Sequence, residues 1–230
     1  MEFILDNPAV ERQFQSVLTT VRAFQNGEVS DNMRLRGMVY KVNLGLSILD
    51  LREIAQSYQP DHLLALKLWN KQWRETMILA TLLDEPAKVT EQQMDVWTKS
   101  FENIEMAEQA SANLWWKSPF AYIKALEWCR GKKHWVHYTA IHLMGRLAMM
   151  DKKSPDEMFE PFFEELLTLS KDPSLSAVTE RTLTILGNRS EYLNTLTMDF
   201  IQQLKDSGNG VAGQLAVVVE DLVAHPLKNQ

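Results

Sequence analysis

Two carboxylates and two indoles stand close together in the segment 101–116, which reads FENIEMAEQASANLWW. On a helix, Glu105, Glu108 and Trp115 share one face, because positions three and four residues apart are neighbours there. A carboxylate held on such a face can act as a catalytic group that stabilises developing positive charge. The alternative is that Glu108 is a solvated helix acid and that Trp115 and Trp116 belong to the core.

An apolar stripe runs beside this polar face and predicts how the helix packs. Its members are Ile104, Ala107, Ala110 and Leu114. We expect the stripe to face the core, which leaves Glu108 free to line a groove.

Positive charge is concentrated between Lys117 and Lys153, although the whole chain of 230 residues has a net charge of −6. An acidic protein is not a typical nucleic-acid binder. The window nevertheless carries a net charge of +6, and the remainder carries −12. Its basic residues are Lys117, Lys124, Arg130, Lys132, Lys133, Arg146, Lys152 and Lys153. Such a strip can follow the phosphates of a nucleic acid, and the alternative is a solvated helical surface.

Other reactive side chains give weaker signals. His134 and His137 have helical spacing, but no nearby Asp, Glu or Cys completes a metal site, so we expect none. The only cysteine, Cys129, cannot form a disulfide within the chain, and we expect a buried structural thiol in a reducing compartment. The start of the chain, MEFILDNPAV, lacks the pattern of a signal peptide, and no stretch has the apolar length of a membrane span. These features predict a soluble cytoplasmic protein.

Helical periodicity dominates the chain, and strand signals are almost absent. Thr90 with Gln93 predicts a capping box, and Ser154, Pro155 and Glu157 predict a helix start. The predicted helices are 9–26, 47–57, 60–70, 73–83, 90–101, 104–116, 118–130, 133–149, 155–170, 174–186, 190–206 and 210–224. The segment 28–45 is the least helical and reads as a long connection.

Helix pairs recur about every 35 to 45 residues, which is the period of HEAT-like solenoids. We therefore predict an all-α fold, an α-solenoid of about six HEAT-like helical pairs with a concave face. No linker interrupts the pattern, so residues 1–230 should form a single domain.

Four segments carry a resemblance to a known family. They read YKVNLGLSILDLREIAQ (40–56), DHLLALKLWNKQWRETMILATLLDEPAKVTEQQMDVW (61–97), KSPFAYIKALEW (117–128) and DKKSPDE (151–157). The chain resembles the AlkD-like DNA alkylation repair family over nearly its whole length. The resemblance implies a curved stack of HEAT-like helical pairs with duplex DNA on the concave face. Active members release cationic 3- or 7-alkylated purines without a metal or redox cofactor.

The resemblance also implies where an active site would lie. Active members use a Trp and an Asp one helical turn apart, then an Arg and a second Trp. The carboxylate and the aromatic face stabilise positive charge on the sugar, and the Arg fixes a phosphate. These four positions are held here by Ile104, Glu108, Tyr138 and Arg181. Only Glu108, which replaces the Asp of active members, keeps a carboxylate, and its additional methylene displaces that carboxylate.

One further line of side chains follows the predicted helix 133–149. It consists of Trp135, Tyr138, His142 and Arg146. Arg146 can contact a phosphate, but it lies about 12 Å along the axis from Tyr138 and does not replace an Arg there.

We therefore predict a monomeric DNA-binding protein that lacks standard alkylpurine excision, with damaged or branched duplex DNA as its partner and no membrane association. The predicted DNA contacts are Lys117, Lys124, Lys132, Lys133, Arg146 and Trp115. Two alternatives stay open: an active 3-/7-alkylpurine DNA glycosylase that uses Glu108, and a protein-binding helical scaffold.

Overall fold

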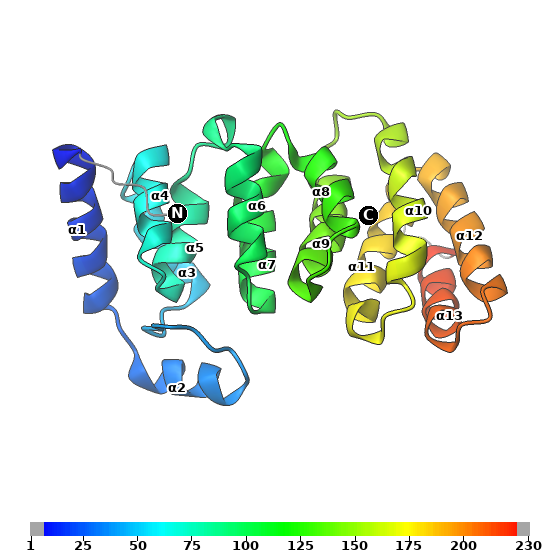
Figure 1. Cartoon of the computed structure of the whole chain (residues 1–230), viewed down its shortest axis with the longest axis horizontal. Helices are drawn as coiled ribbons and strands as arrows, with labels where there is room; N and C mark the ends of the chain where they lie inside the picture. Colours follow the sequence, from blue (N-terminus) through cyan, green and yellow to red (C-terminus); the bar gives the residue numbers. More distant parts are fainter. Residues whose placement is uncertain (1–6, 225–230) are drawn as a thin grey trace, which may run out of the picture. The chain divides into compact units, whose positions relative to one another are not determined.

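Helices account for all the regular structure in the part of the chain that the computed structural model describes, residues 7–224. These residues form thirteen α-helices and four short 3-10 helices and contain no strand, so the all-α prediction is confirmed (Figure 1). The start of the MEFILDNPAV segment, on which the signal-peptide prediction depends, lies outside the described residues. Every helix between residues 7 and 224 is too short or too polar to span a lipid bilayer.

The chain divides into two compact units. Unit 1 contains the described residues up to Gln93 together with Glu102–Ser118, and unit 2 contains Met94–Phe101 and the described residues from Pro119 onward. The prediction of a single domain with one concave face is not tested by this division and stays a prediction.

Unit 1 is built by short amphipathic helices. They are α1 (Pro8–Ala23), α2 (Gly27–Leu35), α3 (Ile48–Gln56), α4 (His62–Asn70), α5 (Arg74–Leu83), η1 (Pro86–Lys88), α7 (Ile104–Asn113) and η2 (Trp115–Lys117). Helix α5 is central, since it packs against α3, α4 and α7 and buries nearly all of its residues. Helix α1 packs against α4 through a stripe of helical period that includes Val10, Phe14, Val17 and Val21.

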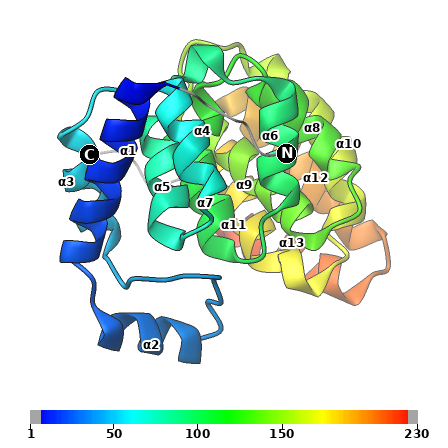
Figure 2. The same ribbon diagram turned by 60° about the vertical axis from the view of Figure 1, so that its left-hand side comes forward.

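Helix α2 differs from its neighbours because none of its residues is buried. It lies apart from α1, α3 and α5 in both views (Figures 1 and 2). The prediction of a long connection over 28–45 is therefore wrong for its first part. Asn26 starts this helix rather than ending the previous one, since its side chain accepts a hydrogen bond from the Val29 N–H at 3.2 Å.

Unit 2 is built around α9, which packs against α8 and α11. Its elements are α8 (Ala121–Cys129), α9 (His134–Met150), η3 (Asp156–Phe159), α10 (Glu160–Leu169), η4 (Pro173–Leu175), α11 (Ser176–Gly187), α12 (Glu191–Asp206) and α13 (Gly210–Ala224). Helix α6 (Glu91–Lys99) begins among the residues of unit 1 and continues in those of unit 2.

Of the two helix starts predicted from the sequence, the structure agrees with one and contradicts the other. The Gln93 N–H donates to the Thr90 hydroxyl at 3.1 Å, as predicted for a cap. The start predicted at Ser154 is wrong, because the Ser154 hydroxyl donates to Asp151 and a 3-10 turn precedes α10. Pro161 then lies in the first turn of α10, where it costs no hydrogen bond and does not kink the helix.

Candidate functional site

Helix α7 carries the first candidate residues. It begins at Ile104 because the side chain of Asn103 accepts a hydrogen bond from the Met106 N–H at 3.1 Å. Met106, Ala107, Ala110 and Ser111 are buried, whereas Ile104 is 42% exposed. The prediction that Ile104 belongs to the core stripe is therefore wrong, because at the first position of the helix it projects toward solvent.

Glu105 is held by two residues from earlier in unit 1. Arg74 donates from Nε to Oε2 at 2.8 Å and from Nη2 to Oε1 at 2.6 Å, and the Tyr40 hydroxyl donates to Oε2 at 2.6 Å. Burial lowers the pKa of Arg74, but Glu105 and Glu75 outweigh this effect and raise the pKa above its ordinary value. Burial, with the charge of Glu105, raises the pKa of the Tyr40 hydroxyl. The Glu105 carboxylate is therefore committed to a structural ion pair.

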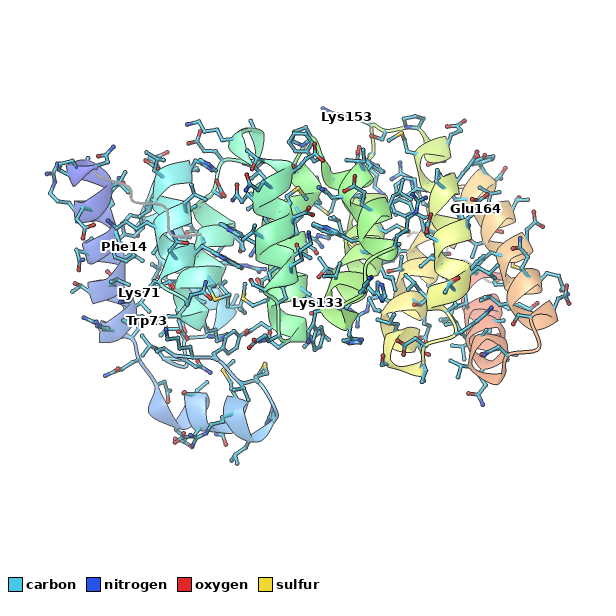
Figure 3. The ribbon with its side chains drawn as sticks, viewed as in Figure 1. Phe14, Lys71, Trp73, Lys133, Lys153 and Glu164 are labelled. Carbon is cyan, nitrogen blue, oxygen red and sulfur yellow. The ribbon has the colours of Figure 1, made fainter. Side chains whose placement is uncertain are left out.

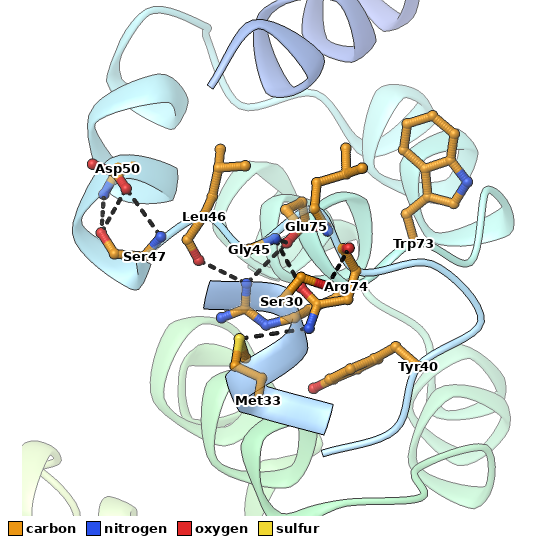
Figure 4. A network of polar contacts seen from close by, with 12 residues as sticks. Ser30, Met33, Tyr40, Gly45, Leu46, Ser47, Asp50, Trp73, Arg74 and Glu75 are labelled. Carbon is orange, nitrogen blue, oxygen red and sulfur yellow. Dashed lines mark hydrogen bonds and ion pairs between the residues drawn. The ribbon is translucent and has the colours of Figure 1, made fainter. Parts of the chain in front are cut away.

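The same network ties a loop to α5 (Figure 4). Arg74 Nη1 donates to the Leu46 carbonyl at 2.7 Å and to Glu75 Oε1 at 3.0 Å. The Glu75 carboxylate accepts hydrogen bonds from the N–H groups of Leu44 and Gly45 at 3.0 and 3.1 Å. Both charged side chains are almost fully buried, so each needs these partners to offset its desolvation.

Glu108 is the other carboxylate of α7 and is half-buried one helical turn after Ile104. Glu105 is paired with Arg74, whereas Glu108 stands at the position to which the resemblance assigns the carboxylate. Its neighbour one turn earlier is aliphatic and offers no aromatic face to a positive charge.

The two tryptophans that follow α7 have different environments. Trp115 is 0% exposed, and Trp116 is half-buried with its Nε1–H donating to the Ala112 carbonyl at 3.1 Å. The predicted DNA contact by Trp115 is wrong, because the core of unit 1 encloses the indole. Exposed Lys117 has its Nζ 5.7 Å from the centroid of the Trp116 ring.

Helix α9 presents the second candidate face, in unit 2. The rings of Trp135 and Tyr138 meet edge to face at 5.7 Å, and those of Tyr138 and His142 stack at 6.2 Å. The predicted line of side chains is thus confirmed for its aromatic members. Tyr138 is only 6% exposed, so most of its ring is core.

Arg146 continues this face by one turn. It is half-buried, and its Nη1 lies 3.8 Å from the sulfur of Met149. The buried Nε of Arg146 has no hydrogen-bond partner among the described residues. This donor is enclosed by protein, so any phosphate contact of Arg146 would use the Nη groups of its guanidinium.

Arg181 lies on α11 (Ser176–Gly187), which packs closely against α9. A Cβ at Gly145 of α9 would lie 2.8 Å from the Thr182 hydroxyl, which donates to the Ile141 carbonyl at 3.0 Å. Thr182 is buried at this contact, whereas Arg181 beside it is exposed. A cation therefore stands where the resemblance implies an aromatic ring.

Two of the basic residues between Lys117 and Lys153 are neutralised by acids. Lys124 is 4% exposed and lies 3.3 Å from Asp95 and 2.6 Å from Glu127. Its predicted phosphate contact is wrong, because the ammonium group is buried and already paired. Arg130 is exposed but pairs with Glu165 at 2.5 Å.

The other basic residues at the start of α9 remain available. Lys132 and Lys133 are exposed, and no carboxylate among residues 7–224 lies within 4.0 Å of either ammonium group. Lys133 donates instead to the Lys99 carbonyl at 2.9 Å. Lys152 and Lys153 are exposed as well.

His134 and His137 have hydrogen-bond partners, and the cysteine is buried. His137 Nε2 lies 2.8 Å from the Gly131 carbonyl, and His134 Nδ1 lies 3.3 Å from the Ser174 hydroxyl. No group of three or more potential metal ligands occurs within the described part of the chain. Burial raises the pKa of the Cys129 thiol to about 12, which agrees with the predicted inert thiol.

Comparison with known proteins decides the family. A family model described as DNA alkylation repair enzyme matches residues 17–174, more than half of the chain. The chain belongs to this family.

A solved structure supports the fold of this family member. One structure matches with a TM-score of 0.69 and 14% sequence identity, covering 82% of each chain. It is described as "A new family of proteins related to the HEAT-like repeat DNA glycosylases with affinity for branched DNA structures". The predicted HEAT-like α-solenoid class is confirmed by this match. Comparison with curated proteins finds no significant match.

In this member of the DNA alkylation repair family, the four positions implied by the resemblance have unlike surroundings. Ile104 is exposed and Glu108 is half-buried in unit 1, whereas Tyr138 is buried and Arg181 is exposed in unit 2. None of them except Glu108 offers the chemistry that the family pattern requires.

The network of Arg74 and Glu75 in this family member was not predicted from the sequence. The signal was present, since two adjacent charged residues open the otherwise apolar α5. Two charged side chains in a helix that is buried on all sides must have hydrogen-bond partners. Those partners include Leu44 and Glu105, each about 30 residues away, one before and one after the pair in the chain. Spacing alone does not identify such partners.

Proposed function

We propose that the protein binds DNA through exposed cationic side chains and lacks the standard excision of alkylated purines. Family membership makes DNA the natural ligand. The replacements at Ile104, Tyr138 and Arg181 support the loss of excision, because they remove an aromatic face, a phosphate-fixing cation and a second aromatic face.

Lys132 and Lys133 carry the proposal. They are adjacent, exposed and without a carboxylate neighbour among residues 7–224, although the chain as a whole is acidic. A phosphodiester supplies the missing negative charge, and release of its counterions drives binding. Arg146 adds a cation on α9 (His134–Met150), the helix that follows Lys133, and Lys117 adds a further cation in unit 1.

Damaged or branched DNA is the proposed form of the ligand, and a monomer is the proposed binding species. The support is the solved relative described as having affinity for branched DNA structures. Contacts of this kind fix the position of the backbone and do not read sequence. We therefore expect binding to depend on DNA shape and salt concentration more than on base sequence.

The test compares wild type with the double variant Lys132→Ala/Lys133→Ala. Each lost phosphate contact should reduce the magnitude of the slope of log K against log salt by about 1. The affinity should fall by a similar factor for DNA of unrelated sequences. Lys171→Ala is the matched control, since Lys171 is also exposed in unit 2 and has no carboxylate within 4.0 Å among the described residues. Unchanged slope and affinity in the double variant would remove Lys132 and Lys133 from the interface.

A second candidate function is alkylpurine excision that uses Glu108. The half-buried Glu108 carboxylate favours it, because an acid is retained on α7 one turn after Ile104. The added methylene relative to Asp displaces the carboxylate by roughly an ångström, which costs on the order of a hundredfold in rate where position matters. Release of free base from alkylated DNA separates the two functions.

A further inference from the structure

A tight turn in unit 1 fixes a tryptophan beside a lysine. Helix α4 ends at Asn70, and Gln72 then adopts a φ of +58°, in the left-handed region that residues other than glycine rarely enter. The Gln72 side chain donates to the Trp69 carbonyl at 2.7 Å, and the Trp73 N–H donates to the Thr76 hydroxyl at 3.3 Å. These two hydrogen bonds fix the turn before and after Gln72. Lys71 and Trp73 lie next to each other at the turn (Figure 3).

Two cations converge on the indole of Trp73. The Arg22 guanidinium, from the last turn of α1, lies 5.1 Å from the ring centroid, and Lys71 Nζ lies 4.7 Å from it. Both distances are within the range of cation–π attraction. The two like charges consequently lie no farther apart than the sum of these distances, so they repel one another.

Neither of these two cations has an ion-pair partner within the described residues. Among residues 7–224, no carboxylate lies within 4.0 Å of the charged group of Arg22 or Lys71. Glu75, the acid nearest to Lys71 along the chain, accepts hydrogen bonds from Arg74 and from the backbone of Leu44 and Gly45. Its charge is thus directed into the unit, away from the indole.

A third cationic residue, Lys41, belongs to a segment whose backbone reaches the same end of α5. The Arg74 N–H donates to the Val42 carbonyl at 2.9 Å, which brings the segment 40–42 to the start of the helix that Trp73 caps. Lys41, next to Val42, is exposed and has no carboxylate within 4.0 Å among the described residues. Arg22 is exposed, and Lys71 and Trp73 are half-buried.

We propose that Arg22, Lys71 and Trp73 form a phosphate-binding site for a DNA strand, with Lys41 at its edge. The indole holds the two cations at a fixed place, and a phosphodiester between them replaces their repulsion with two charge-assisted contacts. This inference rests on the proposed DNA binding and adds a contact site in unit 1 that is separate from Lys132 and Lys133.

The test measures DNA binding of Arg22→Gln/Lys71→Gln across a salt series, with fluorescently labelled duplex and four-way-junction DNA as probes. Two lost phosphate contacts should reduce the slope of log K against log salt by about 2. Arg12→Gln is the matched control, because Arg12 is an exposed arginine of the same helix α1. Thermal unfolding of each variant checks that the fold is kept.

Trp73→Leu and Trp73→Phe provide a second, independent readout. Leucine removes the attraction that holds the cations, so affinity should fall at low salt, whereas phenylalanine keeps a π face and should retain most of the binding. If wild type binds DNA and the Arg22/Lys71 variant binds with the same slope and affinity, the site is overturned and the proposed function stands. If wild type does not bind DNA at low salt, both are overturned.

Discussion

Arg74 contacts Glu105 through two parallel hydrogen bonds, and this ion pair joins α5 to α7 inside unit 1. The Arg74 side chain is 2% exposed and the Glu105 side chain 12% exposed, so the pair is almost dry. One of the two carboxylates of α7 is thereby assigned to structure. The candidate carboxylate of α7 is therefore not Glu105, and Glu108 is the position that the resemblance assigns to it.

Loss of Arg74 should destabilise the protein strongly. Arg74→Ala leaves the buried carboxylates of Glu75 and Glu105 without their cation, so we expect the free energy of unfolding to fall by about 3–5 kcal/mol. Urea denaturation followed by circular dichroism measures the loss. Arg130→Ala, which breaks the exposed pair with Glu165, should cost far less. Equal losses in the two variants would contradict the structural role of Arg74.

Gly45 and Gly37 offer a matched pair of substitutions. Both have positive φ, +79° and +84°, so alanine should cost about 1–2 kcal/mol at either position for the backbone alone. At Gly45 a Cβ would also lie 2.1 Å from the Asn26 carbonyl oxygen, whereas at Gly37 it would meet nothing within 4 Å. Gly45→Ala should therefore be less stable than Gly37→Ala by about 1–3 kcal/mol. Equal thermal stabilities would show that α2 shifts freely relative to the 44–46 loop.

Acid should weaken the turn that follows α9. Burial raises the pKa of Asp151, but hydrogen bonds from Ser154, Lys153 and Tyr122 outweigh it and lower the pKa to about 2 from an ordinary 3.8. A lowered folded-state pKa stabilises the fold above pH 4, and this contribution is lost as the pH falls from about 4 to about 2.

Asp151→Asn tests this dependence, because the amide does not titrate. Unfolding midpoints measured between pH 2 and pH 7 should fall less steeply with decreasing pH for the variant than for wild type. An equally steep fall in the two proteins would mean that Asp151 does not contribute to acid unfolding.

Most of the helices could be predicted from the sequence, because a buried stripe of helical period marks each of them. Helix α2 could not, since it buries no residue and leaves no such stripe. The segment predicted as 104–116 ends as an α-helix at Asn113, where Leu114 turns to φ −128° and ψ −57°. This change of direction turns the Trp115 indole into the core, which helical spacing does not reveal.

The candidate site could be predicted only in part, because charge pairing is a long-range property. Lys124 and Arg130 look alike in the sequence as members of one basic window. Asp95 lies 3.3 Å from Lys124, and Glu165 lies 2.5 Å from Arg130. Each acid lies about 30 residues or more from its basic partner along the chain. The packing of the helices, and not the local spacing, therefore decides which cations have no acidic partner and can bind a phosphate.

Excision of alkylated purines should be absent. Wild type incubated with methylated duplex DNA should release neither 7-methylguanine nor 3-methyladenine, and Glu108→Gln should behave identically. Ile104 supplies no aromatic face and Tyr138 no cation, so the charge that develops on the sugar would lack its usual partners. Chromatography of the released bases measures this, with an active alkylpurine glycosylase as the reference. Release by wild type but not by Glu108→Gln would establish the Glu108 enzyme instead.

The most direct measurement is equilibrium binding of wild type to four-way-junction and duplex DNA at increasing salt. We expect binding at low salt, preference for the branched DNA, and a linear fall of log K with log salt whose slope reports several phosphate contacts. Absence of salt-dependent binding to either DNA at low salt would contradict the proposed function and would favour a helical scaffold that binds proteins.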